Sequence, residues 1–170
     1  IKVVVGTEKK SHVMTEKEKT LTAYHEAGHA VATFFCPTQD PVHQISIIPR
    51  GMAGGYTMSI PTEDRSYKRR KEMQEDLVVL LGGRVAEALV LDDISTGASN
   101  DIERATKTAR SMVTKYGFSE TLGPITYGSD NSEPFLGRDM GHIRDYSETT
   151  ASAIDTEIKT VISNAYQKTE

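Results

Sequence analysis

The sequence predicts a mainly α-helical domain with one small β-hairpin. Several long segments carry apolar residues at three- and four-residue intervals, whereas residues 42–60 are rich in β-favouring residues around a glycine-rich connection. A chain of 170 residues, 37% hydrophobic and 26% charged, is long enough for one domain with a buried core. Residues 1–14 begin as a short extended segment and then become polar, which is typical of a linker.

The first helix is expected over residues 16–35. Thr15 and Glu18 form a capping-box pattern at its start, and Pro37 follows its end. Its apolar positions, which recur at helical intervals, are Leu21, Tyr24, Gly28, Val31 and Phe35. Two strands then follow, the first around residues 42–48 and the second around residues 56–60.

A second helix is expected over residues 67–89. Gly82 and Gly83 in its middle lower helix propensity, so we expect another backbone to approach closely there. Its predicted buried stripe comprises Met73, Leu77, Leu80, Leu81, Val85 and Leu89.

Two more helices complete the predicted fold. One is expected over residues 100–116, with Ser99 as its cap and Gly117 after its end. An irregular loop follows over residues 118–139, and the last helix is expected over residues 140–167.

Composition excludes several classes of function. A net charge of −4 and the absence of Trp do not suit a protein that binds nucleic acid, and no apolar stretch approaches the length of a membrane span. The single cysteine, Cys36, excludes an intramolecular disulfide and a cysteine-rich zinc site, and we expect it to be a small buried residue.

The first helix carries the sequence His-Glu-Ala-Gly-His at residues 25–29, a match to H-E-x-x-H. Residues four apart lie on one face of a helix, so His25 and His29 can bind one metal ion, and Glu26 can reach a water molecule on that ion. The alternative is that both histidines are ordinary helix residues and Glu26 is a solvated carboxylate.

A catalytic zinc ion usually has three protein ligands. The longer H-E-x-x-H-x-x-G-x-x-H pattern requires Gly and His where this chain has Ala32 and Phe35, so the third ligand comes from another element. The residues alone leave several carboxylates open, namely Glu87, Asp92, Asp93 and Asp101. An acid in the first turn of a helix, such as Asp101, is also favoured by the helix dipole alone.

Five segments, in order along the chain, resemble the FtsH-type membrane-anchored ATP-dependent zinc proteases. They are residues 24–31 (YHEAGHAV), 47–51 (IIPRG), 81–87 (LGGRVAE), 95–101 (STGASND) and 146–148 (YSE). The resemblance implies that residues 15–170 form a helical zinc metalloprotease domain, with residues 1–14 linking it to a preceding ATPase region. It also implies one Zn²⁺ per chain bound by His25, His29 and Asp101, with Glu26 as the general base and Glu87 in a supporting role. The edge strand along which substrate aligns would be Tyr56, Thr57, Met58, Ser59 and Ile60.

The same resemblance implies a homo-hexameric ring beneath an AAA+ ATPase ring of the same parent chain, acting on unfolded polypeptides. The parent protein would lie on the cytoplasmic face of a bacterial inner membrane or an organellar equivalent. The chain has no G-x-x-x-x-G-K-[ST] motif and begins with Ile1, so we expect a soluble fragment without direct membrane contact, with ATP bound only in the absent region. The alternative functions are a non-catalytic helical ring-assembly module with a relict zinc site, and a stand-alone peptidase acting on short peptides.

Overall fold

A computed structural model of the chain describes residues 13–50, 54–128 and 144–170. It is mainly helical with one antiparallel hairpin, which confirms the predicted fold class. The elements are α2 (Glu16–Phe35), β1 (Val42–Ser46), β2 (Tyr56–Ser59), α3 (Arg70–Leu91), the short 3-10 helix η1 (Thr96–Ala98), α4 (Ser99–Thr114) and α5 (Glu148–Thr169). Most of the predicted segment 1–14 lies outside the described residues. No helix in the described ranges is long and apolar enough to cross a bilayer.

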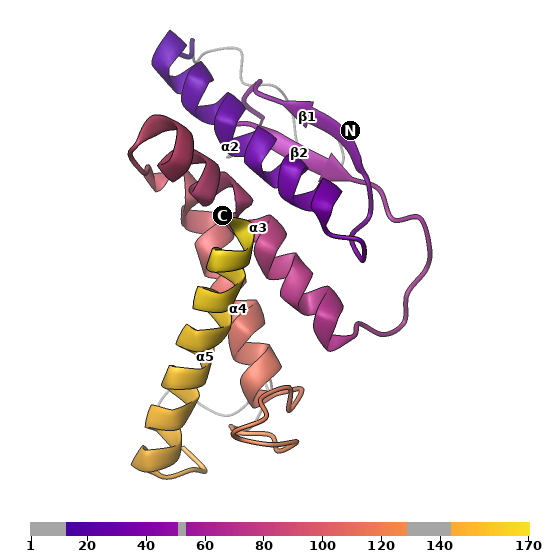
Figure 1. Cartoon of the computed structure of the whole chain (residues 1–170), viewed down its shortest axis with the longest axis vertical. Helices are drawn as coiled ribbons and strands as arrows, with labels where there is room; N and C mark the ends of the chain where they lie inside the picture. The colour runs from indigo at the N-terminus through magenta and orange to yellow at the C-terminus, as the bar shows by residue number, and fades with distance from the viewer. Residues whose placement is uncertain (1–12, 51–53, 129–143) are drawn as a thin grey trace, which may run out of the picture.

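Helix α3 is the central element of the fold. It packs against α2 on one side and against α4 and α5 on the other, while the hairpin lies along α2 (Figure 1). The core between α3, α4 and α5 is apolar, and its most buried members are Leu77, Val78, Leu81, Ala105, Ala109, Met112, Val113 and Ile154. The predicted stripe of α3 is confirmed at most positions but is wrong at Leu89, which is 64% exposed. Leu89 follows the fully buried Glu87 by two residues, so it points to roughly the opposite side of the helix.

Helix α2 buries a polar face. Its capping box forms as predicted, because Glu18 accepts the backbone N–H of Thr15 while Thr15 Oγ1 accepts the backbone N–H of Glu18. The apolar side chains of Val31 and Phe35 are exposed. The buried residues of α2 are His25, Glu26, His29 and Thr33. The inner face of this helix therefore carries the motif rather than an apolar stripe.

Strands β1 and β2 form the predicted antiparallel hairpin. Ile45 pairs with Thr57 and Ser46 with Tyr56, and α2 contacts both strands. Within the described ranges β2 pairs with β1 alone, which leaves its other edge without a strand partner. Ile60, expected as the last residue of this strand, lies just after it.

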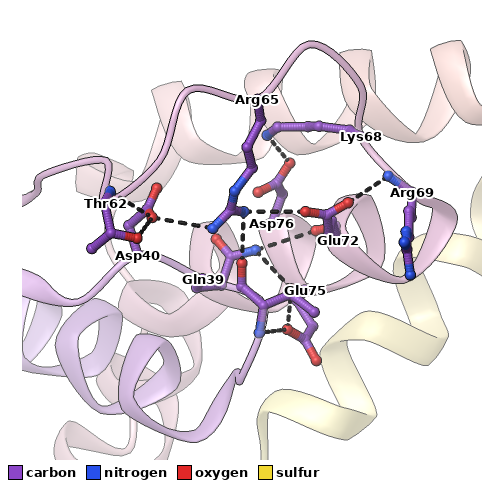
Figure 2. Close-up of polar contacts among 10 residues, drawn as sticks. Gln39, Asp40, Thr62, Arg65, Lys68, Arg69, Glu72, Glu75 and Asp76 are labelled. Atoms are coloured by element: carbon purple, nitrogen blue, oxygen red, sulfur yellow. Dashed lines mark hydrogen bonds and ion pairs between the residues drawn. The ribbon is translucent and has the colours of Figure 1, made fainter.

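The connection from β2 to α3 is held by a network of polar contacts around Arg65 (Figure 2). The guanidinium of Arg65 donates to the Thr38 carbonyl and to the carboxylates of Asp40 and Glu72. Beneath it the buried carboxylate of Glu75 accepts both the backbone N–H and the hydroxyl of Thr38. These contacts fasten the start of α3 to the segment between α2 and β1.

The starts of three helices differ from the prediction. Helix α3 begins at Arg70 rather than at residue 67, after the N-cap Arg69. Helix α4 begins at Ser99 itself rather than after it, because η1 leads directly into it and Ser95 caps η1 instead. Helix α5 begins at Glu148 rather than at residue 140, since the Ser147 hydroxyl accepts the N–H of Thr150 and ends the preceding loop. Residues 140–143 lie outside the described ranges, and residues 144–147 are not helical.

Cys36 lies in the core, as predicted. It is 4% exposed and packs among the buried residues at the end of α2. Burial raises the pKa of its thiol, and the nearby Glu75 carboxylate adds to this effect. Both effects make Cys36 an unreactive packing residue.

Candidate metal centre

Three donor atoms converge where α2 meets the start of α4. The Nε2 atoms of His25 and His29 are 3.0 Å apart, because residues four apart share one helix face. Asp101, in the first turn of α4, places its Oδ2 at 3.2 Å from His25 Nε2 and 3.4 Å from His29 Nε2. The two histidines are buried and Asp101 is half-buried, so the cluster sits inside the molecule with one side accessible.

The outer nitrogen of each imidazole has its own partner. His25 Nδ1 lies 2.7 Å from Glu87 Oε1, and His29 Nδ1 lies 2.7 Å from the carbonyl oxygen of Val79. A carbonyl can only accept, so the proton of His29 is on Nδ1, and the Glu87 carboxylate favours the same tautomer in His25. In the neutral form, the one that binds a metal ion, both imidazoles therefore present an Nε2 lone pair on the side of the cluster where Asp101 lies.

This donor set fits a divalent cation. Ligand atoms around a tetrahedral zinc ion, at bond lengths of about 2.0–2.1 Å, are about 3.3 Å apart, close to the three separations in the cluster. Two lone pairs and a carboxylate oxygen facing one another repel unless positive charge lies between them. Two imidazoles with one carboxylate also form a ligand set that suits zinc.

The electrostatics of the site favour positive charge. Burial opposes a charge on His25, but hydrogen bonds with Asp101 and Glu87 outweigh it, so the pKa of His25 is raised above 6.5. Burial similarly opposes the charge of Asp101, yet hydrogen bonds from the two histidines hold the pKa of its carboxyl well below its usual value. The site therefore keeps an anionic carboxylate in place to face a cation.

Glu87, which contacts His25, also binds Ser95, the residue that caps η1. Glu87 is fully buried, and its second oxygen accepts the backbone N–H of Ser95 at 2.7 Å. One carboxylate thus links the ring of His25 on α2 to the loop that leads into α4. Asp101 lies in the first turn of α4, so Glu87 ties the helix that supplies the two histidine donors to the start of the helix that supplies the third.

Glu26 lies beside the donors but is not one of them. It is 7% exposed, and its side chain extends toward β2, where it contacts the Thr57 hydroxyl. A groove with a volume of about 1020 Å³ passes over this region and is lined by the donor cluster, Glu26 and residues of β2. An extended chain in this groove would meet both the donor cluster and the Glu26 carboxylate.

The structure brings together most of the residues singled out in the sequence. Among the four candidate carboxylates, Asp101 joins the donor cluster, Glu87 lies behind His25, and Asp92 and Asp93 are exposed. Three partners were not anticipated, namely the Val79 carbonyl, the Ser95 N–H and the contact of Thr57 with Glu26. Backbone groups carry no residue-specific signal, so only the hydroxyl of Thr57 could have been considered from sequence.

A helical domain in which an H-E-x-x-H helix and a carboxylate from a second helix share one buried donor cluster defines the class of H-E-x-x-H metallopeptidases. Comparison with known sequences narrows this class. The profile of peptidase family M41 matches residues 12–170, and the chain belongs to this family.

Three curated relatives of this chain are each named as an ATP-dependent zinc metalloprotease FtsH. The chain is 60% identical over 169 residues to the "ATP-dependent zinc metalloprotease FtsH" of Caldicellulosiruptor bescii, covering 99% of the chain and 27% of that protein. It is 59% identical over 169 residues to FtsH 1 of Thermoanaerobacter sp., covering 99% of the chain and 28% of that protein. It is 52% identical over 166 residues to FtsH of Veillonella parvula, covering 98% of the chain and 26% of that protein. The chain thus spans about a quarter of the length of these curated relatives.

Proposed function

We propose that this chain is a zinc-dependent endopeptidase domain that hydrolyses peptide bonds of unfolded polypeptides. The observation that carries the proposal is the convergence of His25, His29 and Asp101 in a groove that also contains the Glu26 carboxylate. Membership of peptidase family M41 and the names of the relatives support the same activity.

In this proposal His25, His29 and Asp101 are the three ligands of one Zn²⁺ per chain. When bound, zinc supplies a Lewis acid that lowers the pKa of water and polarises a carbonyl oxygen. Glu87 and the Val79 carbonyl fix the tautomer and orientation of the two imidazoles, so that Nε2 of each ring remains available. Asp101 contributes the negative charge that partly neutralises the cation.

Glu26 acts as the general base. Its carboxylate accepts a proton from the attacking water and then delivers that proton to the leaving amine nitrogen. Strand β2 supports the extended substrate, since its backbone groups can pair with a polypeptide independently of side chains. This mode of binding suits a peptidase that accepts many sequences.

The proposal includes the setting of the parent protein. Residues 15–170 would form the peptidase domain, with residues 1–14 as the linker to an AAA+ ATPase module that delivers unfolded substrate. The parent would form a homo-hexamer at the cytoplasmic face of a membrane. The relatives are named ATP-dependent and are much longer than this chain, which supports an ATPase module in the same polypeptide.

The decisive experiment is Glu26→Gln. The variant should retain zinc, because Glu26 is not in the donor cluster, and should lose cleavage of an unfolded protein such as casein. Asp101→Ala should instead lower the zinc content measured after dialysis. Turnover retained by Glu26→Gln would refute the assignment of the base, and full zinc in Asp101→Ala would refute the third ligand.

The competing function is a helical ring-assembly module with a relict zinc site. A sizing column and a protease assay with and without a chelator separate the two functions. An oligomer without chelator-sensitive cleavage would favour the module. Cleavage of short peptides without cleavage of unfolded proteins would instead favour a stand-alone small-peptide peptidase. The buried carboxylate of Glu26 in the groove favours the active peptidase.

A further inference from the structure

We propose that Thr57 on β2 is a positioning residue that orients the Glu26 carboxylate for proton transfer. Its hydroxyl lies 2.7 Å from Glu26 Oε2 and 2.9 Å from the backbone carbonyl oxygen of Glu26. The inference rests on the proposed role of Glu26 as general base, and it assigns to β2 a function in addition to substrate alignment.

Thr57 has one hydroxyl proton, and its hydroxyl contacts two oxygens of Glu26. The hydroxyl can donate one hydrogen bond, and both nearby oxygens of Glu26 are acceptors when its carboxyl is ionised. The stronger bond goes to the charged carboxylate, so Thr57 donates to Oε2. The carbonyl contact places the same hydroxyl against the α2 backbone, so the carboxylate is held relative to the helix that carries His25 and His29.

The hydrogen bond selects which oxygen is available for chemistry. Oε2 is bound to Thr57, whereas no hydrogen bond to Oε1 is formed by the described residues. A glutamate side chain has several rotatable bonds, and fixing them costs entropy that otherwise adds to the barrier of proton transfer. Thr57 supplies this order before substrate binds.

The neighbouring glycine brings β2 close enough for this contact. A Cβ added to Gly55 would lie 3.1 Å from Glu26 Cγ and 2.7 Å from the Ser46 carbonyl oxygen, so no side chain fits there. The backbone just before β2 therefore packs directly on the aliphatic part of Glu26. Gly55 confines the stem of the side chain and Thr57 holds its end.

Strand β2 thus contacts the Glu26 carboxylate and, in this proposal, also holds the substrate. Thr57 pairs with Ile45 of β1 in the hairpin register, so its backbone position is set by the sheet. A polypeptide bound along β2 would be placed relative to the same element that holds the Glu26 carboxylate. The strand couples the position of the scissile carbonyl to the position of the base.

The test uses Thr57→Val, which keeps the branched shape but lacks the hydroxyl, and Thr57→Ser, which keeps the hydroxyl. With casein as substrate, Thr57→Val should lower kcat about tenfold to a hundredfold while KM, zinc content and melting temperature stay close to wild type. Thr57→Ser should restore most of kcat. Thr106→Val is the matched control, because the Thr106 hydroxyl is exposed and bonds only to the carbonyl of Ile102 within α4.

Each outcome separates this inference from the proposed function. Activity retained by a parallel Glu26→Gln variant would refute the proposed function itself. Loss in Glu26→Gln with wild-type kcat in Thr57→Val would refute only the positioning role, as would equal losses in Thr57→Val and Thr57→Ser. Loss of zinc in Thr57→Val would also refute it, since the effect would then be structural. Thr57→Ala provides a second variant without the hydroxyl if Thr57→Val does not fold.

Discussion

Gly28 of α2 and Gly82 of α3 lie backbone against backbone. A Cβ added to Gly82 would stand 2.7 Å from the carbonyl oxygen of Gly28 and 3.1 Å from the Cα of His29. The close approach that the sequence predicted at Gly82 is therefore present, and its partner is the middle of the H-E-x-x-H motif. This contact sets the distance between the helix that carries the motif and the helix that carries Glu87.

Gly82→Ala should destabilise the protein. Alanine gains about 1 kcal/mol of helix propensity over glycine, but its methyl group would meet backbone atoms that cannot rotate away. We expect a net loss of about 1–3 kcal/mol in the free energy of unfolding, measured by urea titration. Gly54→Ala is the control, because its added Cβ would find its nearest neighbour at 4.0 Å. A Gly82→Ala variant as stable as wild type would contradict the close contact.

Gly83→Ala should affect the metal centre rather than the helix. A Cβ at this position would lie 2.5 Å from His25 Nε2, so the imidazole must move away from its donor position. The helix itself would gain propensity, by about 1 kcal/mol. We expect an unchanged helical circular dichroism signal with clearly less than one zinc per chain after dialysis. Full zinc occupancy in a folded Gly83→Ala variant would show that the ring has room to adjust.

The local features of this fold could be predicted because they depend on neighbouring residues. The capping box at Thr15 and the histidine pair each act within one or two helical turns. The start of α5 could not be predicted in the same way, because in the sequence the apolar residues Ile143 and Tyr146 continue the helical spacing before Ser147. The Ser147 hydroxyl ends that loop, and hydrophobic periodicity does not detect a capping interaction.

The candidate site was predictable only in part, for a similar reason. Residue types and spacing identified His25 and His29 but left several carboxylates as possible third donors. The choice between Asp101 and Glu87 depends on how α3 and α4 pack against α2, which no local pattern encodes. The resemblance to a known family resolved the choice in sequence, whereas the structure places Asp101 at Nε2 and Glu87 at Nδ1 of the same ring.

Glu87→Gln should weaken zinc binding without removing a ligand. Glu87 accepts hydrogen bonds from His25 Nδ1 and from the Ser95 N–H, one on each oxygen. A glutamine has one accepting oxygen, so one of these donors would face an amide NH₂ group. We expect a loss of about tenfold to a hundredfold in zinc affinity, measured by competition with a chromophoric chelator. Glu103→Gln, an exposed change on α4, is the control. Equal affinity in Glu87→Gln and wild type would exclude a role in orienting His25.

Removal of the metal should lower thermal stability, because the donors join two parts of the fold. Helix α2 packs on α3 and the hairpin, whereas α4 packs on α3 and α5, and the donor cluster is where α2 and α4 meet. Zinc that binds only the folded chain, at a hundred times its Kd, stabilises by about 2.7 kcal/mol. For a domain of this size, that corresponds to a fall of about 5–10 °C in Tm after chelation, reversed by added zinc. The same chelator should have little effect on Asp101→Ala, which lacks one donor. An equal fall in wild type and Asp101→Ala would mean that the chelator acts elsewhere.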